Sequence, residues 1–484
     1  MKLGHFIKPQ SIISKPLSSM LVLVFLSLTS CKAVGPDYKR PEAQLPETFK
    51  STSSELADKV EMSEWWKLFQ DPVLNDLVDQ SLKNNTDIKQ AIARIEASDA
   101  YLKQVGAALY PEVDLSGGAN RSRISQLGPR SIGTSNPESG DYKALIGTSF
   151  ELDFWGKLRR AKESARAQAL SSRYAKSIVD TTLEGLVASN YIQLRSLDAQ
   201  IKVSKDNLKN REDNLNLTQI RMEGGISSAL DVNQSKVSVS NLVASISDLV
   251  RQRVITENLL ARLTGDMNLK IESSDSESLP IAPTPPAGLP SSLLESRPDI
   301  LQAEENMIAA NANIGVAKAA LFPTISLTAN YGGESAALGD ILKSASRLWT
   351  AGLNLDLPIF DSGRLSAQVE QASSIQKQAL ATYQGSIQTA FQEVNDALVS
   401  ARQNAERENA LNNSQESAKK ALEIAQNRYV AGYNSYLDVL DSERVYNDSS
   451  IAFIQSRQAR LQASVDLFKA LGGGWERAQY SNKQ

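Results

Sequence analysis

Very few residues in this chain could carry out catalysis or bind a metal. Its 484 residues include one histidine, His5, and one cysteine, Cys31, although Asp and Glu number 55. Without a histidine in the body of the chain there is no imidazole to act as a general base or metal ligand, and one cysteine gives neither a disulfide framework nor a thiolate metal site. The glycines at 472–474 lack the lysine of a phosphate-binding loop. We therefore expect no enzyme activity, no bound metal and no cofactor.

Cys31 is the one reactive side chain with a recognisable setting. It follows a basic leader and the short apolar run Met20–Leu28, in the pattern of a secretory signal. This run is too short to cross a bilayer, which takes about 20 residues. The end of the leader, Leu28-Thr29-Ser30-Cys31, is similar to the box of bacterial lipoproteins, in which the cysteine is acylated and becomes the mature N-terminus. We predict a signal peptide over 1–30 and a lipid on Cys31; Lys32 stands where inner-membrane retention would need Asp, which favours the outer membrane.

A long stretch of the sequence occurs twice, and it would form the elements that position any other site. A stretch that begins FWGKLRRA at Phe154 is matched by FDSGRLSA at Phe360. Arg221 and Arg428 are 207 positions apart, and the Leu-Asp-Val triplets at 230–232 and 437–439 have the same displacement. A fixed displacement over turns and helix ends indicates a duplicated architectural unit.

Each copy predicts a very long helical hairpin. From Gly156 to Met222 there is no proline, and apolar residues recur at intervals of seven, which is the stripe of a coiled coil. The stripe consists of Val187, Leu194, Ile201, Leu208, Leu215 and Met222. At ~1.5 Å per residue, roughly 66 residues make a rod of about 100 Å. The chain turns at 223–225 and returns to about 264; in the second copy the turn is at 431–434.

Two segments in each copy are predicted β-strands, at 112–124 and 142–154, and at 324–334 and 347–358. Apolar residues occupy alternate positions in them. In the first copy one face carries Ala144, Ile146, Phe150 and Leu152 together with Thr148. In the second copy the alternate positions are Ile325, Leu327, Ala329, Tyr331, Trp349, Ala351, Leu353, Leu355 and Leu357. Such segments are typical of transmembrane β-barrels. The alternative is an amphipathic sheet of a soluble domain, but strands inserted between long helices have no obvious soluble core to cover.

The other segments complete the predicted organisation. An extended acylated arm, 31–62, precedes a first repeat, 63–278, with helices at Trp65–Lys83 and Asp87–Ala108 and the long hairpin 156–265. A Pro-rich connector, 279–296, is expected to be stiff and extended. The second repeat, 297–473, contains the hairpin 361–472, and a polar tail, 474–484, ends the chain.

Together these motifs are similar to those of the outer membrane factor family, the TolC-like exit ducts of tripartite efflux pumps. The residues that carry the resemblance are Cys31 with Gly35-Pro36-Asp37-Tyr38, Trp65-Trp66, Leu109-Tyr110-Pro111, Asp153-Phe154-Trp155-Gly156, Arg297-Pro298-Asp299-Ile300, Leu321-Phe322-Pro323, Tyr429–Asp438 and Ala470-Leu471-Gly472-Gly473. They cover nearly the whole mature chain. They resemble most the acylated branch that works with resistance–nodulation–division pumps.

The resemblance implies a mixed α and transmembrane β fold with an internal two-fold repeat. A homotrimer would form one outer-membrane β-barrel from four strands per subunit, continued by a long α-helical coiled-coil tunnel in the periplasm. Trimerisation also follows from the strands, because four could not close a barrel and open edges are untenable in lipid. A wall of helices one layer thick needs no large apolar core, which fits a composition of 22% charged and 6% aromatic residues.

The resemblance also implies which residues matter at the tip of the tunnel. Leu437, Asp441 and Arg444, at i, i+4 and i+7 on one helix face, would line the pore gate. Only the second copy carries the charged pair, since the first has Gln234 and Val237 at the equivalent positions. The residues expected to face the adaptor protein are Gly224, Gly225, Leu230, Asp231, Gly432, Leu437 and Asp438. The alternative for the gate residues is that they are ordinary solvated charges on a helix near a turn. The alternative for the tip glycines is that tight turns need glycine.

The function that follows is a passive exit duct for drugs or other small molecules. An inner-membrane pump would drive export through a periplasmic adaptor, and the duct would be lipid-anchored in the bacterial outer membrane. One alternative is a non-pore structural coiled-coil lipoprotein of the cell envelope. Another is the adaptor itself, which is disfavoured because its plan has a single hairpin. A net charge of −3 gives no basic field for nucleic acid.

Overall fold

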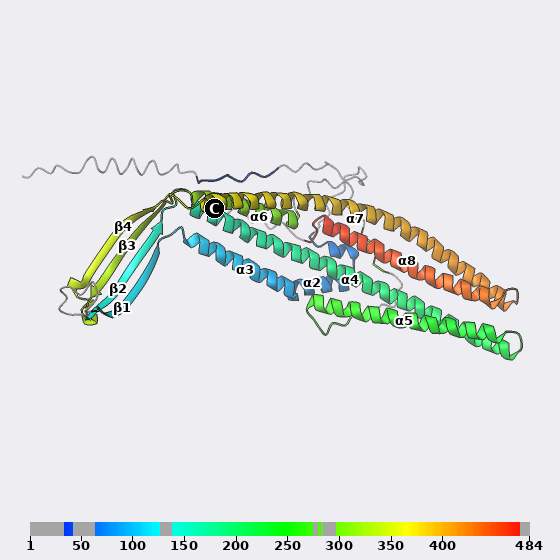
Figure 1. Cartoon of the computed structure of the whole chain (residues 1–484). Coiled ribbons are helices and arrows are strands. Elements are labelled where there is room, and N and C mark those ends of the chain that lie inside the picture. Colours follow the sequence, from blue (N-terminus) through cyan, green and yellow to red (C-terminus); the bar gives the residue numbers. More distant parts are fainter. Residues whose placement is uncertain are drawn as a thin grey trace, which may run out of the picture. The chain divides into compact units, whose positions relative to one another are not determined.

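The computed structural model describes residues 33–41, 63–125, 138–273, 279–280, 282–283 and 297–474. The predicted signal peptide, Cys31 and nearly all of the polar tail lie outside the described residues, as does most of the connector. The described chain forms two compact units. The first comprises residues 33–39, 100–167 and 308–378, and the second comprises the remaining described residues. Figure 1 labels their helices and strands.

The first unit contains a four-stranded antiparallel sheet of order β1-β2-β3-β4. Its strands are β1 (Glu112–Arg123), β2 (Glu138–Glu151), β3 (Thr324–Ser335) and β4 (Arg347–Asp356). The second strand begins at Glu138, four residues before the predicted 142, and ends at Glu151. Residues 138–141 pair with 120–123 and extend the hydrogen-bonded ladder beyond the predicted start of the strand.

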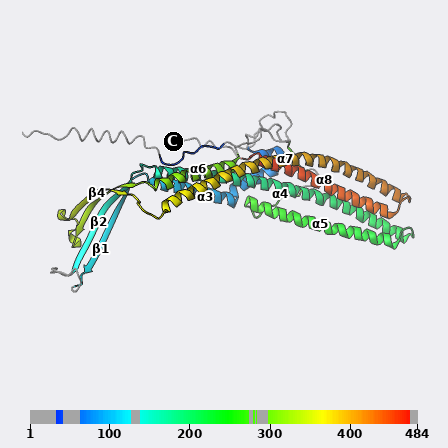
Figure 2. The ribbon, with the colours of Figure 1, turned by 45° about the horizontal axis from the view of Figure 1, so that its top comes forward.

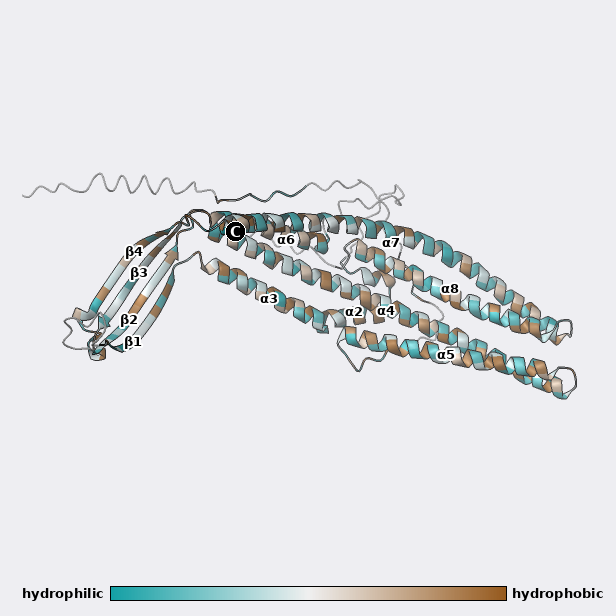
Figure 3. Cartoon of the chain, viewed as in Figure 1, coloured by the Kyte–Doolittle hydropathy of each residue, from teal (hydrophilic) through white to brown (hydrophobic). Residues whose placement is uncertain are grey.

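The alternate apolar positions of the strands form rows across one face of the sheet. Ile146 is paired with Tyr331, which is paired in turn with Trp349. Residues directly opposite in neighbouring strands project to the same face, so the row is continuous. Its side chains are exposed in the single chain, as are those of Leu353 and Leu355. Figure 3 shows the hydrophobic colour on the strands.

An extended arm, residues 33–39, lies against the helical residues of the first unit. The Val34 amide donates to the Trp155 carbonyl at 2.9 Å, and the Arg160 guanidinium pairs with Asp37 at 2.6 Å. Gly35 has φ 104° and approaches Gly315 so closely that an added Cβ would lie 2.5 Å from its Cα. Glycine at both positions therefore permits the contact.

The second unit is dominated by two helix pairs. In each pair the two helices run side by side in both views of the chain (Figures 1 and 2). The pairs are α4 (Lys157–Glu223) with α5 (Ala229–Thr264), and α7 (Arg364–Val430) with α8 (Tyr436–Ala470). Of the shorter helices, α2 (Pro72–Asn84) belongs to the second unit, whereas α3 (Thr86–Ala107) and α6 (Pro298–Ala319) each have residues in both units.

The single helix predicted at Trp65–Lys83 is two elements. A short 3-10 helix, η2 (Trp65–Phe69), ends at Gln70 in the left-handed conformation, with φ 54°. Helix α2 then begins at Pro72, and the Asp71 side chain caps it by accepting from the amides of Val73 and Leu74. Proline is favoured in the first turn of a helix but cannot continue one, so the break lies where Pro72 stands.

The predicted coiled-coil stripe on α4 is buried for part of its length only. Val187, Leu194 and Ile201 are in the core, whereas Met222 is exposed near the turn. Around the buried part, Trp65 stacks on Phe468 with ring centroids 5.7 Å apart. None of the described helices is both long and apolar enough to cross a membrane.

Candidate functional site at the hairpin tips

Both long hairpins close with the same turn geometry. Gly225 and Gly432 have φ of 76° and 80°, which favours glycine. The amide of Ile226 donates to the Arg221 carbonyl at 2.8 Å, and the equivalent bond from Tyr433 is also 2.8 Å. This is the Schellman helix ending. No described atom lies within 4 Å of a Cβ added at either glycine, so the backbone conformation, not crowding, sets the requirement.

The predicted tip carboxylates bind the chain's own backbone. The Asp231 carboxylate accepts the Ser228 amide at 2.9 Å, and the Ser228 hydroxyl accepts the Asp231 amide at 3.2 Å. The Asp438 carboxylate accepts the Ser435 amide at 3.1 Å and the Ser435 hydroxyl at 3.0 Å. Both aspartates therefore start the returning helices and also place negative charge at a helix N-terminus, where it is favourable.

The turns present apolar side chains to solvent in the single chain. Ile226 and Tyr433 occupy equivalent positions after the glycines, and both are exposed. Leu230 and Leu437, also equivalent, are exposed in the first turns of α5 and α8. Gly224 lies just after α4 and donates its amide to the Ile220 carbonyl at 3.0 Å.

The structure brings two of the three predicted gate residues into contact. Arg444 Nη2 donates to Asp441 Oδ1 at 2.8 Å, and its Nη1 lies 3.5 Å from Asp448 Oδ2. The pair with Asp441 raises the pKa of Arg444. Leu437 lies one turn before Asp441 and is 60% exposed. The three residues thus share an exposed face of α8.

The opposite side of α8 packs into the molecule. Tyr436 and Val439 are buried with Tyr429 of α7. The Tyr436 hydroxyl is hydrogen-bonded to the Ser235 hydroxyl of α5, and Arg221 of α4 lies over the Tyr429 ring at 4.6 Å. One small cluster therefore joins all four long helices next to the second turn.

A buried glutamate in this region was missed in the sequence analysis. Glu443 is 5% exposed and accepts a hydrogen bond from Asn214 of α4. Burial raises the pKa of Glu443, although Asn214 and Arg211 oppose the shift. A signal for this contact exists in the sequence: Asn207 and Asn214 are seven residues apart, each one position before a leucine of the predicted stripe.

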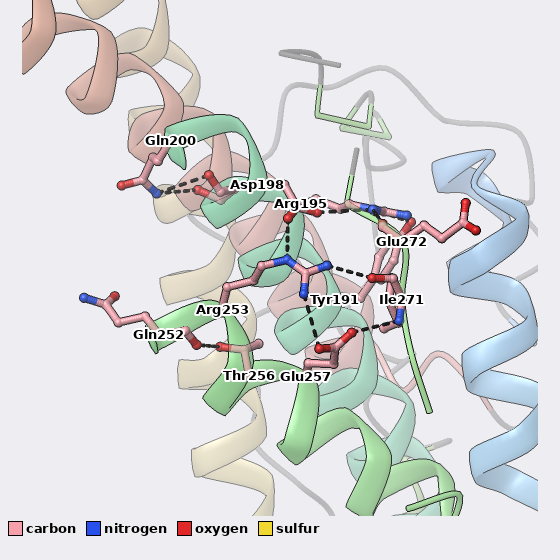
Figure 4. A network of polar contacts seen from close by, with 11 residues as sticks. Tyr191, Arg195, Asp198, Gln200, Gln252, Arg253, Thr256, Glu257, Ile271 and Glu272 are labelled. Atoms are coloured by element: carbon pink, nitrogen blue, oxygen red, sulfur yellow. Dashed lines mark hydrogen bonds and ion pairs between the residues drawn. The ribbon is translucent and has the colours of Figure 1, made fainter. Parts of the chain in front are cut away.

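A second buried carboxylate, Asp198, joins α4 to α5 (Figure 4). Arg253 Nε donates to Asp198 Oδ1 at 2.6 Å, and Arg195 Nη1 donates to Oδ2 at 3.3 Å. The same guanidinium groups bind backbone carbonyls of the segment after α5, at Ile271 (2.7 Å) and Glu272 (2.8 Å). Spacing along the chain links only Arg195 and Asp198, which are three residues apart on α4, because Arg253 and the two carbonyls come from α5 and the segment after it.

The described residues contain no group of three or more His, Cys, Asp or Glu side chains that could hold a metal ion. The polar side chains at the tips are instead used in helix caps, ion pairs and contacts between helices. This arrangement can position charge along a helix face, but it offers no nucleophile with an adjacent base.

Comparison with known proteins identifies the family of the chain. The model of the family described as outer membrane efflux protein matches residues 77–266 and 289–473. The probable efflux pump outer membrane protein TtgC of Pseudomonas putida is 35% identical, over 97% of this chain and 98% of the relative. The pyoverdine export outer membrane protein OpmQ of Pseudomonas aeruginosa is 33% identical, over 89% of this chain and 91% of the relative.

Solved structures agree with the sequence matches. The outer-membrane channel OprN superimposes with a TM-score of 0.84 at 30% identity, covering 91% of this chain and 99% of OprN. The Campylobacter jejuni CmeC outer membrane channel gives a TM-score of 0.87 at 26% identity, covering 92% of this chain and 96% of CmeC. The chain has the fold of these channels and belongs to the outer membrane efflux protein family.

Proposed function

We propose that three copies of this chain form a passive exit duct through the bacterial outer membrane. The duct joins a periplasmic adaptor and an inner-membrane pump, and the pump supplies the energy for export. The family and the solved channels support this function, and they do not favour a non-pore coiled-coil lipoprotein. The observation that carries the proposal is the four-stranded sheet, whose exposed apolar face suits a lipid-facing barrel wall.

The trimer is supported by the edges of the sheet. Within the described chain, β1 and β4 each have one paired neighbour only. An unpaired edge in lipid leaves backbone groups without hydrogen bonds, so other copies must complete the barrel. Four strands from each of three subunits would do so. The duplication of the chain is supported by equal helix lengths, since α4 and α7 both have 67 residues.

The transported compounds are proposed from the relatives. One relative is named as part of a toluene efflux pump and another as a pyoverdine export protein. We infer that this duct likewise passes drugs or other small molecules. A wide passive tunnel need not select among them, so the pump sets the substrate.

The other predicted segments keep their roles in this proposal. Residues 1–30 are a signal peptide, and an acyl group on Cys31 anchors the arm 31–62 in the outer membrane. The repeats 63–278 and 297–473 are joined by the connector 279–296, and 474–484 is a tail. The docked part of the arm, in which Asp37 pairs with Arg160, supports an anchor close to the first unit. Mass spectrometry of the purified protein should show a chain that starts at Cys31 and carries an acyl group on that residue.

The gate is proposed to lie on the exposed face of α8. Three Leu437 side chains meeting on the axis would form an apolar constriction that resists wetting. Three Asp441 carboxylates nearby would attract cations and repel one another, and the Arg444 pairing would hold them close. The tip residues Gly224, Gly225, Leu230, Asp231, Gly432, Leu437 and Asp438 would face the adaptor.

Planar-bilayer recordings of the purified protein test the duct and its gate. The wild type should conduct poorly and prefer cations. Leu437→Ser or Arg444→Ser should raise the conductance, and Asp441→Ala should weaken the cation preference. Leu230→Ser changes the equivalent exposed leucine of the first hairpin and is the matched control. If the three α8 variants match the wild type in conductance and selectivity, the constriction lies elsewhere; a protein that never conducts contradicts the duct itself.

A further inference from the structure

A line of polar residues on α4 faces the second hairpin. These residues recur every seven positions, each one place before a residue of the apolar stripe. They are Gln200, Asn207, Asn214 and Arg221. Each contacts the second hairpin: Gln200 meets Gln455 at 3.3 Å, Asn207 meets Asn447 at 2.9 Å, Asn214 meets Glu443, and Arg221 meets the Tyr429 carbonyl at 3.3 Å. The two hairpins are therefore held together near the tips by polar contacts rather than by a continuous apolar seam.

Glu443 of α8 is the one carboxylate among the partners of these four α4 residues, and it is incompletely paired. Its Oε2 is buried and has no hydrogen-bond partner among the described residues. The nearest cation is Arg211 of α4, whose Nε lies 3.9 Å from that oxygen and is itself buried without a hydrogen-bond partner in the described chain. A buried ionised oxygen without a donor is costly, so the neutral carboxyl suits this position better.

The groups around Glu443 come from all four long helices. Arg211 and Asn214 face it from α4, and Tyr436 adjoins it on α8. Tyr429 of α7 stacks on Tyr436. From α5, Ser235 binds the Tyr436 hydroxyl and the Ser238 carbonyl accepts Arg211 Nη1 at 3.1 Å. Arg211 is thus the only cation against it in the described structure, and it is shared with a backbone carbonyl.

Its place on α8 connects this contact to the proposed gate. Asp441 and Arg444 flank Glu443 in the sequence and lie on the exposed side of the same helical turn. A rigid helix transmits any movement of its buried side to its exposed side. The packing of Glu443 on α4 therefore positions Asp441 and Arg444.

We propose that Glu443 is a proton-sensitive latch between the two hairpins, neutral when α8 is packed on α4 and loosening that packing as it ionises. The proton is taken from solution and is held on the unpartnered Oε2. The inference rests on the proposed function for its link to conductance, but not for the movement itself. Glu443 is a positioning residue, since it acts on the gate through α8.

The direction of the pH effect follows from the burial. Burial raises the pKa of Glu443 in the packed state, and in a separated state the pKa would return to the ordinary glutamate value of 4.5. Proton binding therefore favours the packed state. Packing is strongest at acidic pH and weakens as the pH rises from the ordinary value through the raised one.

Hydrogen exchange of the intact protein tests the latch without requiring a channel. The protection of the amides at 436–447, corrected for the intrinsic pH dependence of exchange, should fall about tenfold between pH 5 and pH 8. Glu443→Gln should keep the high protection at pH 8. Arg211→Gln, which removes the only nearby cation, should enlarge the fall. Glu423→Gln, at an exposed glutamate of α7, is the matched control and should behave as wild type.

The same variants in planar bilayers connect the latch to the gate. Wild-type conductance should rise with pH over the same range, and Glu443→Gln should remove that rise. The latch is contradicted if the corrected protection of the wild type does not change between pH 5 and pH 8. It is also contradicted if the protection falls equally in Glu443→Gln. A protein that shows the pH-dependent protection but never conducts supports the latch and contradicts the proposed duct.

Discussion

Asp198 and Glu443 both join α4 to a neighbouring helix, but their surroundings differ. Asp198 is 2% exposed, and guanidinium groups at 2.6 and 3.3 Å reach both of its oxygens. Glu443 is almost as buried, but it has one amide donor, and the only cation near it among the described residues is 3.9 Å away. A buried charge is stable where its partners and hydrogen bonds are complete. We infer that the Asp198 contact is a permanent joint and the Glu443 contact a breakable one.

A third buried carboxylate extends the comparison. Glu184 of α4 is 1% exposed, and its Oε2 has no hydrogen-bond partner among the described residues. Burial raises the pKa of Glu184 to about 9, with a further contribution from Asp180, while Trp65 and Lys176 oppose the shift. Glu184 is thus neutral at physiological pH, and it lacks the guanidinium partners that Asp198 has. Pairing, not burial alone, separates the three sites.

The largest expected effect is at the permanent joint. Asp198→Asn would leave Arg195 and Arg253, both largely buried, without their shared carboxylate. Breaking a buried pair in this way costs about 3–5 kcal/mol. We expect a lower midpoint of chemical denaturation, followed by circular dichroism. The matched control is Asp248→Asn on α5, whose ion pair with Arg251 is exposed; it should leave the midpoint unchanged. Equal midpoints for the two variants would contradict the permanent joint.

The next largest effect is at Glu184, where a substitution should raise the stability of the folded chain instead of lowering it. Glu184 stays neutral in the folded chain up to a pKa of about 9, but it ionises near pH 4.5 when unfolded. The unfolded state then binds fewer protons, so this residue lowers stability as the pH rises between those values, by at most about 1.4 kcal/mol per pH unit. Glu184→Gln should remove the loss and be more stable than wild type at pH 8, with little difference at pH 4. Denaturation midpoints at both pH values measure this. A variant that is less stable at pH 8 would show that Glu184 is ionised and paired.

The comparison also shows what could be read from the sequence. The long hairpins and the strands come from residue spacing, because seven-residue and alternate patterns and fixed displacements are properties of neighbours along the chain. The proposed gate positions come from the family resemblance instead. The matched glycines 225 and 432 predicted both turns, and the structure places them in the left-handed conformation. The break between η2 and α2 was missed, although Pro72 marked it. The pairing of Asp198 with Arg253 could not be found, because it depends on where α5 lies against α4, although Arg195 stands three residues before Asp198 on the same helix.

The smallest expected effect is at the two turns, where equal backbone geometry is capped differently. The Ser228 hydroxyl accepts an amide of its helix, whereas the Ser435 hydroxyl donates to the Asp438 carboxylate. Removing an N-cap hydroxyl that accepts an amide costs about 1 kcal/mol. Ser228→Ala should therefore speed hydrogen exchange at residues 229–232 by about fivefold. Ser435→Ala should change exchange at 436–439 less, because the Ser435 hydroxyl donates to the Asp438 carboxylate and its removal takes no acceptor from a helix amide. Equal acceleration at both turns would mean that the two caps contribute alike. Faster exchange only at the second turn would contradict the bonding described here, and would place the stronger cap next to the latch.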